Sequence, residues 1–125
     1  MPAVVILLVE KDAPLLKTEK LLYESRGYKV LAAKTRVQAE KMLGAQWADV
    51  IVLGHSLSWD DREVLIAKSR LISPDTRILV IHASGAFQPV PPDAAIDSRD
   101  GLEKVFAAFD SFFGEEKNSS RAGQH

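Results

Sequence analysis

The chain has 125 residues, of which 46% are hydrophobic and 26% are charged, with no cysteine and a formal net charge of −1. This composition suits one globular domain with its own core. It argues against a basic nucleic-acid-binding surface, a disulfide framework and a thiolate metal site. No apolar segment is long enough to cross a bilayer, and no basic stretch precedes the first apolar run, so we expect a cytoplasmic protein without a signal peptide.

The first predicted element is a strand at Val4 to Val9, six apolar residues in a row. An uninterrupted apolar run of this length is typical of a parallel strand that is covered on both faces. The run ends in Glu10, Lys11 and Asp12. Ligands and catalytic groups collect at the carboxyl ends of strands in open α/β sheets, so this charged cluster is the first candidate site.

The remaining predicted elements alternate between helices and strands. Helices are expected at 14–26, 37–44, 59–71 and 98–114, and strands at 28–33, 50–53, 78–81 and 94–96. This alternation predicts an α/β fold, a single flavodoxin-like domain whose five-stranded parallel sheet has helices on both faces.

Polar and glycine residues mark the predicted helix ends. The expected caps are Asp12, Ser58 or Asp60, and Ser98, and the expected stops are Gly27, Gly44 and Gly114. In the third helix the side chains expected to face the core are Val64, Leu65, Ala67 and Leu71.

The segment from Ala83 to Asp93 interrupts the alternation with three prolines and a glycine. Prolines inside a helix lose hydrogen bonds and clash with the preceding turn, so we expect a Pro-rich loop where a fourth helix is due. Residues 1–114 then form the domain, and residues 115–125 are expected to be a flexible tail or the stub of a linker.

Several stretches resemble, in order and spacing, the receiver domains of two-component response regulators. They are Ile6 to Asp12, Gly27 to Val30, Ala48 to Leu53, Pro74 to Ile81 and the Leu102-Glu103 opening of the last helix. In that family the first strand ends in an acidic pair that holds Mg²⁺, and the third ends in the aspartate that accepts a phosphoryl group. The fourth strand ends in Thr or Ser, and the fifth in Lys-Pro.

At these positions the chain departs from the family. The corresponding residues are Glu10 and Lys11, Gly54, His82, and Asp97 with Ser98. Glycine supplies no nucleophile, and Lys11 would repel Mg²⁺ and pair with Glu10 or Asp12 instead. We therefore expect a pseudo-receiver, with no enzyme activity, cofactor or bound metal. Its degenerate phosphorylation pocket is Glu10, Lys11, Asp12, Gly54, His82 and Asp97.

The resemblance implies a module that acts in signal transduction independently of phosphorylation. Its expected partner is another signalling protein or a second copy, bound through the last helix and the Pro-rich loop, with no contact to nucleic acid or membrane. Without a fourth helix to cover the sheet edge, part of an aromatic set should be exposed. This candidate partner surface is Phe87, Phe106, Phe109, Phe112 and Phe113.

Two alternatives stay open at this point. The domain could be phosphorylated at a non-standard residue, such as Asp12, Asp60 or His55. It could also sense a small anion or nucleotide-like ligand in space above Gly54 that Lys11 and His82 border.

Overall fold

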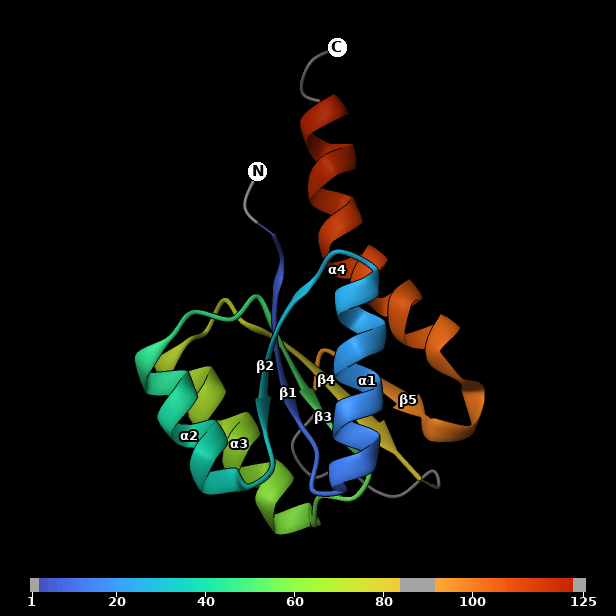
Figure 1. The fold of residues 1–125 in the computed structure, drawn as a ribbon. Coiled ribbons are helices and arrows are strands. Elements are labelled where there is room, and N and C mark those ends of the chain that lie inside the picture. Colours follow the sequence, from blue (N-terminus) through green and yellow to red (C-terminus); the bar gives the residue numbers. More distant parts are fainter. Residues whose placement is uncertain (1–2, 84–91, 123–125) are drawn as a thin grey trace.

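The computed structural model describes residues 3–83 and 92–122, with residues 115–122 described by their backbone alone. Four helices and five strands occur in this part of the chain, in the predicted alternating order (Figure 1). The strands are β1 (Val5–Val9), β2 (Lys29–Ala33), β3 (Val50–Leu53), β4 (Arg77–His82) and β5 (Ala94–Asp97). The helices are α1 (Ala13–Ser25), α2 (Arg36–Ala45), α3 (Trp59–Ile72) and α4 (Leu102–Ala122), with a 3₁₀ turn at Ser98–Asp100.

The five strands form one parallel sheet in the order β2-β1-β3-β4-β5. The predicted flavodoxin-like α/β fold is therefore confirmed. The order reverses next to β1, so the carboxyl ends of β1 and β3 meet at the switch point, where ligands of such sheets bind. Residues 9 and 53 lie side by side in the register of these two strands, which places Glu10 next to Gly54.

The sheet is buried on both faces because successive side chains of each strand point to opposite sides. On one side, Leu7 and Ile51 belong to a core that α2 and α3 cover (Figure 1). On the other, Ile6 and Val50 belong to a core that α1 and α4 cover. Two covered faces explain why the strands are continuous apolar runs with no polar alternation.

The caps of α1 and α3 and the end of α1 follow the predicted chemistry. The predicted stop at Gly44 is wrong, because Gly44 lies inside α2, which ends at Ala45. Asp12 caps α1 by accepting a hydrogen bond from the Leu15 N–H at 3.0 Å, and Gly27 leaves the helix with φ of 90°. Ser58, rather than Asp60, caps α3 by accepting from the Asp61 N–H at 3.1 Å.

The start and the end of the last helix were predicted wrongly. Asp97, not Ser98, caps a 3₁₀ turn, and Gly101, with φ of 81°, separates this turn from α4. The backbone of α4 continues past Gly114 to Ala122. An interior glycine costs a helix only about 1 kcal/mol relative to alanine, so a single glycine need not end it.

The predicted inward face of α3 is also partly wrong. Leu65 is fully buried, but Ala67 is exposed and Leu71 is 83% exposed. Val64 is half-buried. The buried residues of α3 are Arg62, Leu65, Ile66 and Ser69. The helix thus places an arginine and a serine toward the sheet and leaves apolar residues at its end in solvent.

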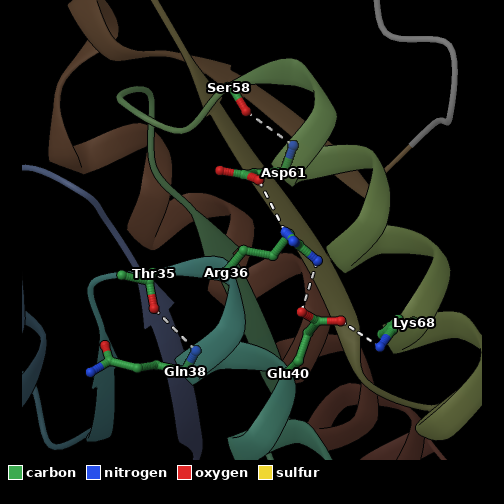
Figure 2. Close-up of polar contacts among 7 residues, drawn as sticks. All are labelled: Thr35, Arg36, Gln38, Glu40, Ser58, Asp61 and Lys68. Carbon is green, nitrogen blue, oxygen red and sulfur yellow. Dashed lines mark hydrogen bonds and ion pairs between the residues drawn. The ribbon is translucent and has the colours of Figure 1, made fainter.

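A polar network joins α2 to α3 on the outer surface (Figure 2). Arg36 donates from Nε to Asp61 Oδ1 at 3.1 Å and from Nη1 to Glu40 Oε2 at 2.9 Å. Lys68 contacts the other carboxylate oxygen of Glu40. The hydrogen bond from Lys68 is the main reason that the pKa of Glu40 lies below its usual value. These partly exposed pairs fix how the two helices pair but contribute little stability each.

Between β4 and β5 the chain runs through residues 83–93, of which 84–91 lie outside the described residues. The predicted Pro-rich loop falls mostly in that segment. In residues 83, 92 and 93, which are described, there is no helix. Asp93 accepts hydrogen bonds from the Ile78 N–H at 2.7 Å and from Arg70 at 3.2 Å, and so fixes the start of β5 beside β4.

The two leucines of α3 provide a matched pair of variants. We expect Leu65→Ala to lower the free energy of unfolding by about 2–5 kcal/mol, because it leaves a cavity in the core under β3 and β4. Leu71→Ala should change it by less than about 0.5 kcal/mol, because the side chain is already in water. Urea denaturation of both variants checks this, and equal losses would contradict the observed orientation of α3.

Candidate functional site

At the switch point, the side chain of Glu10 occupies the place where a side chain from β3 would lie. Glu10 is fully buried, and a Cβ atom placed on Gly54 would overlap its Oε2 and lie 2.6 Å from its Cδ. The space above Gly54 was predicted to be empty, and this is wrong. The carboxyl group from β1 fills it, so a side chain at position 54 would require Glu10 to move.

The Glu10 carboxyl group is incompletely compensated. Its Oε1 accepts from the Asp12 N–H at 3.2 Å, while Oε2 is buried without a hydrogen-bond partner among the described residues. Burial is the main cause that raises the pKa of Glu10, and the Asp12 N–H and the charge of His55 oppose the rise. The group is thus held where water cannot solvate its charge well.

A buried arginine supports the loop that follows β3. Arg62 is 4% exposed, and its Nη2 donates to the carbonyl oxygens of His55 at 2.9 Å and Gly54 at 3.3 Å. Its guanidinium lies 4.7 Å from the centre of the Trp59 ring. Burial lowers the pKa of Arg62, and the negative charge of Glu10 raises it again. Arg62 therefore provides the positive charge on the α3 side of the Glu10 carboxyl group.

On the α1 side, two further buried polar groups extend the cluster. Glu19 is 7% exposed, and Tyr23 is fully buried. Glu19 Oε2 and the Tyr23 hydroxyl have no hydrogen-bond partner among the described residues. Burial, together with the charge of Glu10, raises the pKa of Glu19 to about 7. Burial also raises the pKa of Tyr23, with smaller effects from Glu19 and Glu10.

The two residues after Glu10 form hydrogen bonds that fix the loop after β1 and the start of α1. The side chain of Asp12 caps α1, and the N–H groups of Lys11 and Asp12 both point to Ser56 Oγ, at 3.1 and 3.3 Å. Lys11 is exposed and borders a groove toward α2. Among the described residues no carboxylate lies within ion-pair distance of it. The predicted pairing of Lys11 with Glu10 or Asp12 is therefore wrong.

His82 and Asp97 lie beside each other at the ends of β4 and β5. Asp97 binds Arg99, with Oδ2 to Nη2 at 2.6 Å, and this hydrogen-bonded pair holds the pKa of Asp97 well below its usual range. His82 borders a small pocket of about 170 Å³ together with His55 and Arg62. The structure thus places His82 near the loop after β3, as predicted. The carboxyl group of Asp97 forms an ion pair with Arg99.

The two carboxylates of the charged cluster after β1 accept hydrogen bonds from backbone groups. Glu10 and Asp12 each accept from a main-chain N–H of the loop or of α1. Among residues 3–83 and 92–114, whose side chains the structure describes, no three His, Cys, Asp or Glu side chains converge as metal ligands. No described helix combines the length and apolarity that a bilayer requires.

The aromatic residues of α4 are less exposed than predicted. Phe109 is fully buried and Phe112 is 8% exposed, because both pack into the core between α4 and the sheet. Phe106 and Phe113 are half-buried, and Arg26 lies 4.2 Å above the Phe106 ring. Phe87 lies outside the described residues.

The sequence interpretation missed three residues that shape the site: Glu19, Tyr23 and Arg62. Each has a signal in the helical spacing. Glu19 stands three residues after Leu16 and four before Tyr23, on the buried face of α1. Arg62 likewise precedes Leu65 and Ile66 by three and four residues. Polar residues at buried helical positions would have identified this cluster.

Comparison with known proteins relates the chain to response regulators. No family model matches it. It is 31% identical over 93 residues to the alginate biosynthesis transcriptional regulatory protein AlgB of Pseudomonas putida, a match that covers 74% of this chain. The chain spans about a fifth of the length of this relative, 20%.

Solved receiver structures share the fold. The signal receiver domain of an HD domain-containing protein from Pseudomonas fluorescens superposes with a TM-score of 0.80 at 15% identity, covering 94% of this chain and 99% of that one. A response regulator from Burkholderia pseudomallei, solved with a phosphorylated aspartic acid, gives 0.77 at 24% identity over 98% and 75% of the two chains. The fold of this chain is therefore the receiver fold.

The buried Glu19 carboxyl group makes a prediction for pH dependence. Its pKa is about 7 in the folded protein, against 4.5 for an exposed glutamate. Between these two values the folded state keeps a proton on Glu19 that the unfolded chain has lost. The contribution of Glu19 to the free energy of unfolding therefore falls as the pH rises from about 4.5 to 7. We expect Glu19→Gln to match the wild type near pH 5 and to exceed its free energy of unfolding by about 2–3 kcal/mol at pH 8.

Chemical denaturation across this pH range measures the difference between the two proteins. Glu24→Gln is the control on the same helix, because Glu24 is exposed and pairs with Lys20; this variant should keep the pH dependence of the wild type. If the free energy of unfolding changed with pH in the same way for Glu19→Gln and the wild type, the raised pKa would not belong to Glu19.

Proposed function

We propose that this receiver-fold domain is a signalling module that binds another protein and does not depend on phosphorylation. It acts in the cytoplasm, within or beside a two-component pathway, as a binding domain and not as an enzyme. The likeness to receiver domains and to the AlgB regulators supports the signalling role. The arrangement around Gly54 supports the independence from phosphate.

The single observation that carries the proposal is the contact between Glu10 and Gly54. A phosphoryl acceptor at the end of β3 needs a side chain there, free space above it and a divalent ion beside it. Here the side chain is absent, the Glu10 carboxyl group takes the space, and the next residue is the exposed Lys11. All three requirements are thus unmet at one point.

The alternatives left open by the sequence gain little support. Asp12 uses a carboxylate oxygen to cap α1, and modification there would remove that cap. Asp60 is exposed at the start of α3, and the His55 carbonyl accepts a hydrogen bond from Arg62. Among the side chains that the structure describes, no cluster of carboxylates suited to Mg²⁺ surrounds either residue. A small anion above Gly54 would meet the buried Glu10 carboxyl group, which would repel it.

The proposed partner surface is the α4 side of the domain, where receiver domains use their last helix and strand. Of the aromatic residues suggested for it, Phe106 and Phe113 keep part of their rings exposed. Phe109 and Phe112 would support the surface from within the core. Another signalling protein and a second copy of the chain are both compatible with this surface.

The test is incubation with acetyl phosphate and Mg²⁺ followed by intact-protein mass spectrometry. We expect no phosphoryl adduct on the wild type. Gly54→Asp alone should remain unmodified and lose stability, because its side chain would overlap the Glu10 carboxyl group. A stoichiometric adduct on the wild type would overturn the proposal.

The combined variant Glu10→Asp, Lys11→Asp, Gly54→Asp serves as the positive comparison. Shortening the side chain at position 10 removes the overlap, and the new carboxylate at position 11 completes an acidic pair for Mg²⁺. We expect this variant to gain an adduct that depends on Mg²⁺, which would locate the defect in these three positions.

A further inference from the structure

A cavity of about 190 Å³ lies between α1 and the start of α4, at the carboxyl ends of β4 and β5. Figure 1 shows these two helices side by side on one face of the sheet. The walls are mainly aliphatic, from Leu15, Leu22, Ile81, Ile96, Leu102 and Val105. A buried apolar cavity of about 150 Å³ is enough to bind benzene. This space can therefore hold a molecule built on one ring or a short branched alkyl group.

Glu19 is the unusual group in this wall. It comes from the middle of α1, is 7% exposed, and has a carboxylate oxygen without a hydrogen-bond partner among the described residues. A buried carboxyl group in that condition is unfavourable, because it has lost water and gained nothing in exchange. Glu19 borders the cavity, so a ligand bound there that donates a hydrogen bond to its carboxyl group would lower this cost.

The charges around the cavity favour a positive ligand. Glu10 lies close enough to raise the pKa of Glu19, in addition to the larger effect of burial. Asp97 also borders the cavity, with its charge balanced by Arg99. His55 is the basic side chain in the wall, and its charge offsets only part of the negative potential of Glu10. Glu19 is thus the carboxyl group in the wall that lacks a compensating partner, and a cation in the cavity would pair with it.

We propose that this cavity binds a small organic ammonium ion, whose ammonium group pairs with Glu19 while its apolar body packs against Leu102 and Val105. The proposal does not rest on the absence of phosphorylation at Gly54. Binding there would tie α1 to the start of α4, the helix whose exposed aromatic residues belong to the proposed partner surface. The domain would then respond to an amine at a place separate from the former acceptor position.

Benzylamine is the probe, because it joins one aromatic ring to one ammonium group. We expect it to raise the melting temperature with increasing concentration up to about 10 mM and to give saturable heat in titration calorimetry. Benzyl alcohol and benzoate, of the same shape but without positive charge, should bind at least about tenfold more weakly. Ammonium chloride at equal concentration should give no comparable shift.

Matched variants assign the binding to Glu19. Glu19→Gln should weaken benzylamine by about tenfold or more and leave benzyl alcohol nearly unchanged, whereas Glu24→Gln should leave both unchanged. Leu102→Phe, which fills the cavity from its rim, should abolish binding of both compounds and keeps the test valid if Glu19→Gln does not fold. The proposal is overturned if benzylamine does not bind, if it binds Glu19→Gln or Leu102→Phe equally well, or if the neutral or anionic analogue binds as tightly.

Discussion

The carboxyl group of Glu10, buried against Gly54, is the constraint around which the carboxyl end of the sheet is arranged. It leaves β1 at the switch point and takes the volume that a side chain at the end of β3 would need. A buried carboxyl group must be compensated, and here an N–H of the α1 cap and the positive charge of Arg62 do part of this. Arg62 in turn holds the loop after β3 through two carbonyl groups.

Much of the fold could be predicted from the sequence because it depends on local signals. Continuous apolar runs identified the buried parallel strands, and the Asp12 and Ser58 caps and Gly27 marked helix ends through their own chemistry. The orientation of α3 could not be predicted from hydrophobicity, because Arg62 and Ser69 face the sheet while Leu71 lies in water. The end of α4 was misjudged because one glycine is a weak interruption of a helix.

Part of the site's membership was missed in the sequence, and its geometry could not be predicted from it. Comparing positions one at a time places Gly54 where the family has an acceptor, and it suggests an empty space. Which neighbour enters that space depends on the rotamer and reach of Glu10 on an adjacent strand, and no residue-by-residue comparison contains this information. The same holds for Glu19 and Tyr23, whose importance follows from being buried beside Glu10.

The contact between Glu10 and Gly54 also bears on how this domain could change over evolutionary time. An aspartate side chain introduced at position 54 would overlap the Glu10 carboxyl group. This substitution alone would therefore destabilise the domain. Shortening Glu10 first would leave a void and a partly unsupported Arg62. Each substitution is disfavoured until the other has occurred, so an acidic side chain at position 54 is difficult to introduce through single mutations.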